Sequence, residues 1–160
     1  MTIELNEVVF FPQGTAKLCQ MPYPGHPRGC PCFGKKKGCP PSCPRLDEVL
    51  DLNLPVFAII NAFDLGSHIE KMRVKHPNWT ERQLRNVLYW QPGARKKLRS
   101  RIADFRAAAP EYYIETNPEA RGVNVTETLR KSGIILECPP KKTAMQVAVA
   151  GIPKGYNHGR

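Results

Sequence analysis

The sequence predicts a single small α/β (or α+β) domain, in which a mixed sheet packs against helices and carries a Pro/Gly/Cys-rich loop near the N-terminus. The chain has 160 residues, of which 41% are hydrophobic, so it can bury a core without metal or disulfide staples. Short apolar runs typical of strands are interspersed with capped segments of helical periodicity. We therefore expect one domain over residues 1–153, including the loop at 19–44, and a flexible tail at 154–160.

Apolar runs predict where the strands lie. The first is Ile3–Phe11, and Pro55–Phe63 is the most apolar run of the chain. The length and branched residues of Pro55–Phe63 favour a central, buried strand. Shorter strands are expected at Tyr112–Ile114 and at Ile134–Cys138, where two prolines end the second. A final strand is expected over Ala144–Ile152, with its alternate residues sharing one apolar face.

Capping residues mark the starts of two helices. Asp64 is placed to cap a helix over Gly66–Lys75. Asn124 and Glu127 match a capping box, in which each residue satisfies a free backbone N–H of the first turn. Gly133 lies where a glycine commonly ends a helix, so a helix is expected between Asn124 and Gly133.

The stretch between these segments is also predicted to be helical. Thr80 and Gln83 match a capping box, and Pro92-Gly93 is expected to break the helix that they start. Its apolar face contains Leu84, Val87 and Leu88. A further helix should follow, with Leu98, Ile102 and Phe105 on one face.

Positive charge is concentrated in these helices. The net charge is +10, and Lys71–Arg106 holds 11 Lys or Arg against two acidic residues. Together with nearby aromatic and amide side chains, this charge suits DNA or RNA as a partner. It suits a solvated helix surface without a partner equally well. The nucleic-acid hypothesis assigns binding to Arg82, Arg85, Arg95, Lys96, Lys97 and Arg99.

Five of the six cysteines lie within 25 residues, from Cys19 to Cys43. Cysteines that serve as small hydrophobic residues belong in strands and helices, and Cys138 is expected to be one. The five lie instead in a segment rich in Pro and Gly, residues 19–44, which we call the cysteine segment and expect to contain no helix or strand. This number and spacing predict metal binding. The predicted ligands are Cys19, Cys30, Cys39 and Cys43, with Cys32 and His26 as alternatives.

The spacing favours an iron–sulfur cluster of the 4Fe-4S type over zinc. Ten, one, six and three residues separate successive cysteines, so the segment has no Cys-x2-Cys knuckle of the zinc-ribbon type. Iron–sulfur clusters accept irregular spacing, and three of the cysteines precede proline, as the last ligand of the ferredoxin motif does. Lys35–Lys37 could offset the negative charge of thiolate-ligated iron. Zinc stays open as the alternative cofactor.

The motif Cys30-Pro31-x-Phe33-Gly34-Lys35, followed by Cys39-Pro40-Pro41, resembles the signature of an uncharacterised cysteine-rich family of predicted metal-binding proteins. Pro118–Val125 resembles the C-terminal part of that family. The strings Pro22–Pro27 and Trp79–Lys97 resemble a smaller microbial and phage-type subgroup. The resemblance implies metal or iron–sulfur binding through Cys30, Cys39 and Cys19, and it implies no established reaction. Members often carry a second cysteine cluster, where this chain has only Cys138.

Further features of the sequence limit where the protein can act and which functions stay open. No run approaches the roughly 20 apolar residues that a membrane helix needs, and the acidic N-terminus lacks a secretory core. We therefore expect a cytoplasmic protein with reduced thiols and no membrane partner. Two alternative functions stay open: a zinc-stapled structural or nucleic-acid-binding module, and a thiol redox enzyme that uses Cys30 or Cys32. The sequence assigns no catalytic residue, reaction or oligomeric state.

Overall fold

Four antiparallel strands form the sheet around which the chain folds. The computed structural model describes residues 1–22 and 26–156. The strands are β1 (Thr2–Glu4), β2 (Phe57–Asp64), β3 (Tyr113–Glu115) and β4 (Thr143–Gly151), in the spatial order β1-β2-β4-β3. The predicted α/β or α+β class is confirmed. The sheet is not mixed, however, because every strand pairing among the described residues is antiparallel.

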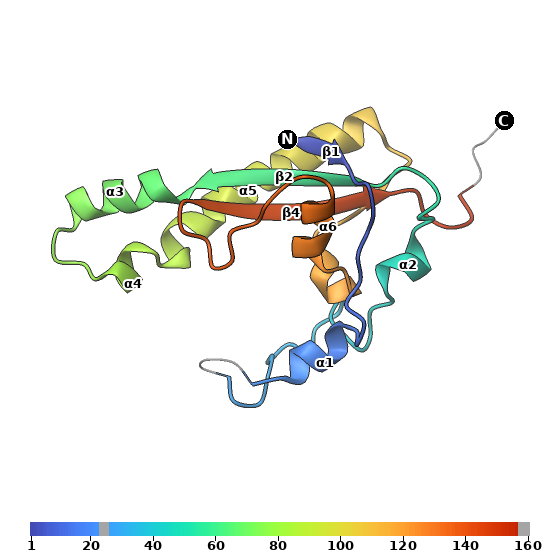
Figure 1. Ribbon diagram of the computed structural model, residues 1–160, viewed down its shortest axis with the longest axis horizontal. Coiled ribbons are helices and arrows are strands. Elements are labelled where there is room, and N and C mark those ends of the chain that lie inside the picture. Colours follow the sequence, from blue (N-terminus) through green and yellow to red (C-terminus); the bar gives the residue numbers. More distant parts are fainter. Residues whose placement is uncertain (23–25, 157–160) are drawn as a thin grey trace.

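Helices cover both faces of the sheet (Figure 1). α5 (Val87–Ala108) buries Leu98 and Ile102 against one face, in the same core as Ile59 and Ala148. α2 (Leu46–Val49) and α6 (Val125–Lys131) bury Leu46 and Leu129 against the other face, together with Ile60. Neighbouring residues of β2 thus enter different cores, as expected when side chains alternate along a strand.

The remaining helices flank this sheet. α3 (Leu65–Lys75), α4 (Glu81–Leu84) and the start of α5 enclose a smaller core that includes Ile69, Leu84 and Trp90. α1 (Thr15–Gln20) and the 3-10 helix η1 (Pro118–Arg121) lie beside the cysteine segment. Within residues 1–22 and 26–156, no helix is both long enough and apolar enough to cross a membrane.

The three predicted helix caps are confirmed. The Asp64 carboxylate accepts hydrogen bonds from the Ser67 N–H and Oγ at 2.8 and 2.7 Å. Thr80 and Gln83 form a complete capping box. Asn124 Oδ1 accepts the Glu127 N–H at 3.1 Å, but the Glu127 carboxylate binds Arg130, so only this half of the predicted second box forms. Each of these bonds joins residues three apart, so it depends on the local sequence rather than on contacts with distant segments.

The predicted break at Pro92 is wrong, because α5 runs through it from Val87 to Ala108. Asn86 caps α5 and sets a register that buries Trp90 and Ala94, whereas Leu88 is 75% exposed. The expected apolar face at 84, 87 and 88 is therefore also wrong. Proline leaves the carbonyl four residues earlier, that of Leu88, without its helical partner. Because Leu88 is exposed, water can bind that carbonyl in place of the missing partner. Burial of Trp90 and Ala94 stabilises the helix on either side of Pro92.

Two predicted strands differ from the structure. Only Thr2–Glu4 of the first run pairs as a strand, and the chain then leaves β2 to reach α6, where the Asn124 N–H donates to the Val9 carbonyl at 2.7 Å. Ile134–Cys138 forms no strand. The Ile134 N–H instead closes the end of α6 by donating to the Leu129 carbonyl. Cys138 is consequently exposed, and its predicted place in a strand core is wrong.

Candidate functional site

The cysteine segment begins on a helix. Cys19 lies in the last turn of α1, so the expectation that this segment contains no helix is wrong at its first residue. The chain then returns, and the Cys30 N–H donates to the Cys19 carbonyl at 2.7 Å. Gly29 makes this approach feasible: it is buried, its φ is +78°, and a Cβ there would lie 2.5 Å from the Cys19 oxygen.

Tight turns fold the rest of the segment. The Cys32 carbonyl accepts the N–H groups of Lys35 and Lys36, each at 3.1 Å, and the Gly34 N–H donates to the Pro40 carbonyl at 2.9 Å. The Cys39 N–H donates to the Lys36 carbonyl at 3.0 Å. Cys39 is close enough to Cys19 for its charge to raise the pKa of the Cys19 thiol.

The thiols of the four predicted ligands influence one another. Burial raises the pKa of Cys19, and the negative charges that Cys30, Cys39 and Cys43 would carry raise it further. Burial also raises the pKa of Cys43, against the opposing effect of the Arg121 charge. The fold thus brings these four cysteines into one electrostatic neighbourhood. Like charges held together are unfavourable unless a cation neutralises them.

The donor set suits a thiophilic metal, but its side chains are not assembled for coordination. All six cysteines are free thiols, and thiolates select zinc, copper(I) and iron–sulfur clusters. In the described part of the chain, no three His, Cys, Asp or Glu side chains are gathered to hold a metal ion. The Cys43 thiol donates a hydrogen bond to the Ala120 carbonyl at 3.3 Å. Ligation by Cys43 therefore requires this bond to break.

The two alternative ligands, Cys32 and His26, lie in backbone turns. Cys32 is half-buried, and its backbone carbonyl is occupied by the turn at Lys35. His26 is exposed, and its carbonyl accepts the Gly29 N–H at 3.0 Å. Residues 23–25 of the string that resembles the microbial subgroup lie outside the described residues, as do residues 157–160 of the predicted tail.

A buried ion pair ties the end of the cysteine segment to the sheet. Arg121 on η1 binds Glu115 of β3 through Nε at 2.8 Å, and the two side chains are only 16% and 11% exposed. Arg121 also donates to the Tyr113 hydroxyl at 3.2 Å and to the Pro44 carbonyl at 3.1 Å. This pair was not predicted from the sequence. The available signal was a carboxylate directly after an apolar strand run.

The six residues assigned to nucleic-acid binding do not act as one group. Arg85 donates to the carbonyls of Pro140 and Lys141 at 3.3 and 3.5 Å and lies 3.7 Å from Glu81. Arg82, on α4, is exposed. Of the four on α5, Arg95 and Arg99 line a cleft, whereas Lys96 and Lys97 do not.

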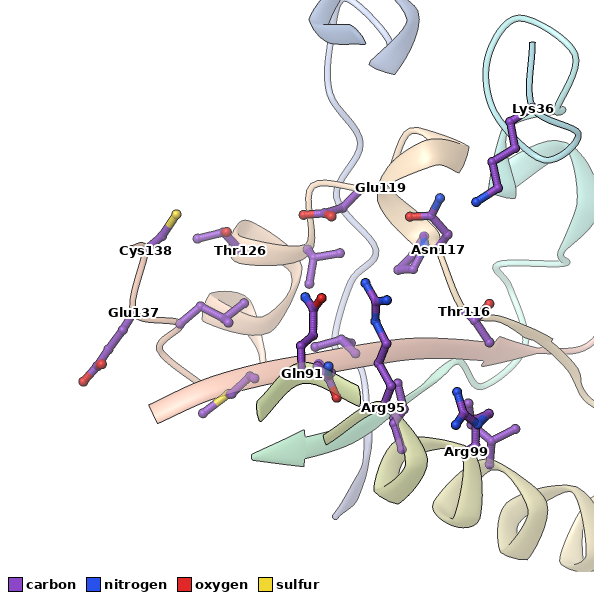
Figure 2. A pocket seen from close by; sticks show the side chains of 18 residues that line it. Lys36, Gln91, Arg95, Arg99, Thr116, Asn117, Glu119, Thr126, Glu137 and Cys138 are labelled. Atoms are coloured by element: carbon purple, nitrogen blue, oxygen red, sulfur yellow. The ribbon is translucent and has the colours of Figure 1, made fainter. Parts of the chain in front are cut away.

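This cleft lies along β4 and has a volume of about 710 Å³. Figure 2 shows Gln91 and Arg95 extending from α5 toward Asn117 and Glu119, while Lys36 reaches in from the cysteine segment. Desolvation raises the pKa of the Glu119 carboxyl, although the residue as a whole is exposed. The cleft combines an apolar floor with cations that pair with no carboxylate of the described residues, and nothing in the sequence pointed to it.

No protein-family model, curated protein or solved structure matches the chain. The resemblance to a metal-binding family therefore stays a prediction. What the chain does has to be inferred from its own residues and their geometry.

Proposed function

We propose that the protein binds a metal centre, a 4Fe-4S iron–sulfur cluster, through Cys19, Cys30, Cys39 and Cys43. The observation that supports this function is that four free, half-buried thiols interact electrostatically, since the charges of Cys30, Cys39 and Cys43 all act on Cys19. Small hydrophobic cysteines would have no reason to meet in a segment of tight turns. A zinc staple is the alternative that the same donor set allows.

The chemistry of the segment is consistent with thiolate ligation. A metal ion deprotonates the thiols that bind it and reverses the repulsion that raises the Cys19 pKa. Exposed Lys35–Lys37 in the same segment add positive charge near a cluster that would be negatively charged overall. An iron–sulfur cluster supplies electron transfer or, with an open iron position, Lewis acidity. The proposal includes a cytoplasmic location, which keeps thiols reduced.

The test is anaerobic purification followed by a visible absorption spectrum and analysis of iron, sulfide and zinc. We expect a brown protein, and we expect Cys39→Ala to lose most of its iron and its charge-transfer absorption. Cys138→Ala is the matched control, because Cys138 is an exposed thiol outside the segment. It should keep both signals at wild-type levels.

Other outcomes lead to the alternative functions. A colourless protein with one equivalent of zinc would contradict the cluster and favour the zinc-stapled module. A metal-bound protein in which Cys30 or Cys32 still reacts rapidly with an alkylating agent would favour the thiol redox enzyme, since ligand thiols should be protected.

We also propose that DNA or RNA binds the exposed surface of α5. The supporting observation is that Arg95, Lys96, Lys97 and Arg99 are exposed and form no ion pair with any described residue. Each cation on a phosphate releases counterions, so affinity should fall as salt rises.

Replacing Lys96 and Lys97 by glutamine should weaken binding to a single-stranded oligonucleotide and reduce the salt slope by roughly one to two. A titration at several salt concentrations measures both. The control is the double variant of Arg130 and Lys131 to glutamine, because both already pair with carboxylates. Binding that is absent at low salt, or equal losses in the two variants, would rule out this surface.

A further inference from the structure

The cleft along β4 is a gap in the sheet. β3 pairs with only the last part of β4, from Tyr113 opposite Gly151 to Glu115 opposite Val149. The chain then turns away, as the Asn117 N–H bonds to the Glu115 carboxylate at 2.8 Å. The stretch of β4 from Thr143 to Ala148 therefore has β2 on one side and, among residues 1–22 and 26–156, no strand on the other.

The pairing pattern determines which backbone groups face the gap. The Ile60 N–H donates to the Met1 carbonyl on the β1 side, at 2.8 Å. Backbone groups alternate sides along a strand, so Asn61 faces β4 and bonds with Gln146. Met145 and Val147 must then direct their N–H and C=O groups away from β2, into the cleft that both residues line. No hydrogen bond from another described residue reaches these four groups.

We propose that the cleft binds an extended, acidic peptide segment of a partner protein, which adds a strand to the open edge of β4. Unpaired strand edges are templates for strand addition, in which main-chain bonds give affinity and side-chain pockets give specificity. At about 3.4 Å per residue, the open stretch from Thr143 to Ala148 has room for roughly five residues of guest.

The charges along the cleft specify an acidic guest. Arg95, Arg99 and Lys36 line it, and none of them pairs with a carboxylate in the part of the chain that the structure describes. Glu137 also lines the cleft, but its carboxylate is turned away (Figure 2) and accepts three backbone N–H bonds. Glu119 is the carboxyl that faces the cleft. The charge available to a guest is therefore positive overall.

The two walls specify an alternating sequence. α5 lies on one face of the sheet and offers Arg95 and Arg99, whereas the α6 side offers Val125 and Leu136. Because side chains alternate along a strand, a guest with acidic residues at one set of positions and apolar residues at the other satisfies both walls. The wall residues include no aromatic side chain on which a nucleic-acid base could stack.

The test uses a fluorescently labelled peptide, acetyl-Glu-Val-Glu-Val-Glu-amide, titrated with the full chain. We expect saturable binding that shifts the backbone amide NMR signals of Met145 and Val147. Two N-methylated versions, one methylated on the valines and one on the glutamates, keep the side chains but remove alternate N–H donors. One version should lose at least tenfold in affinity and the other should not, since only alternate N–H groups of a strand face β4.

Protein variants test the charge. The double variant of Arg95 and Arg99 to glutamine should weaken peptide binding at least tenfold. The matched control replaces Arg101 and Arg106 by glutamine, which removes the same charge from the same helix outside the cleft. Folding of each variant is checked by its amide spectrum, so a loss of binding can be assigned to the cleft.

Several outcomes would overturn the proposal. Equal affinity of both N-methylated peptides and the parent would exclude strand pairing. Equal losses in the two double variants would show unspecific attraction, and displacement of the peptide by inorganic phosphate at similar concentration would show a general anion site. None of these measurements requires bound metal, so failure here is distinguishable from failure of the metal-centre proposal.

Discussion

Replacing Arg121 by leucine should lower the free energy of unfolding by up to about 3–5 kcal/mol, the cost of removing one partner of a fully buried ion pair, since this pair is largely buried. Glu115 would keep its bonds from the Tyr113 hydroxyl and the Asn117 N–H, but it would lose its cation inside the protein. The Pro44 carbonyl would also lose its donor. Urea denaturation followed by circular dichroism measures the change.

The control for this variant is Arg130→Leu. Arg130 pairs with Glu127 at 2.8 Å, the same distance as Arg121 with Glu115, yet the two side chains are 61% and 39% exposed. Exposed pairs contribute about 0–1 kcal/mol, because water and salt screen them. Losses of similar size in the two variants would show that Arg121 is not buried as described.

Replacing Gly29 by alanine should detach the cysteine segment from α1. The new Cβ would lie 2.5 Å from the Cys19 carbonyl oxygen and 2.8 and 2.9 Å from backbone atoms of Gln20, none of which can move without moving the helix. The positive φ adds roughly 1–2 kcal/mol for a residue with a Cβ. We expect the Cys30 amide, which donates to Cys19, to lose its protection from hydrogen exchange, while the amides that pair β2 with β4 keep theirs.

The Gly34→Ala variant separates the effect of the close contact from the effect of the positive φ. Gly34 also has a positive φ, +67°, but a Cβ there would meet nothing within 4 Å. It should therefore show only the backbone strain, with the Cys30 amide still protected. Equal deprotection of Cys30 in both variants would mean that the close contact of Gly29 with α1 does not hold the segment.

These two variants also bear on the proposed metal centre. If the segment must dock on α1 for Cys19 and Cys30 to act together, Gly29→Ala should lose metal although all four cysteines remain. Arg121→Leu should affect metal content less, because Arg121 bonds to the last residue of the segment, Pro44, rather than to the part that docks on α1. Its charge also acts on Cys43, where it opposes the raised pKa. Measuring metal in both variants tells which attachment the centre needs.

The parts of the fold that depend on neighbouring residues were predictable from sequence. The caps at Asp64, Thr80 and Asn124 join residues three apart. Pro55–Phe63 was recognised as a central strand because a continuous apolar run of that length must be covered on both faces. The crowding of cysteines between 19 and 43 was equally visible, since it is a property of spacing alone.

Other features depended on contacts that spacing does not reveal. Pro92 stays helical because Trp90 and Ala94 bury one side of α5, and Cys19 is helical although proline and glycine follow it. The pair of Arg121 with Glu115 arises because η1 returns to the edge of β3.

The sequence by itself determined the class of fold, the helix caps and the candidate ligands of the proposed metal centre. Only the tertiary structure decided that four of those cysteines share one neighbourhood, that the basic residues of α5 divide between a cleft and open surface, and that β4 keeps an open edge. The physical reason is the distance along the chain over which each interaction acts. Caps and periodicity act within one or two turns of chain, whereas burial, ion pairing and strand pairing are settled between segments that meet only when the chain is folded.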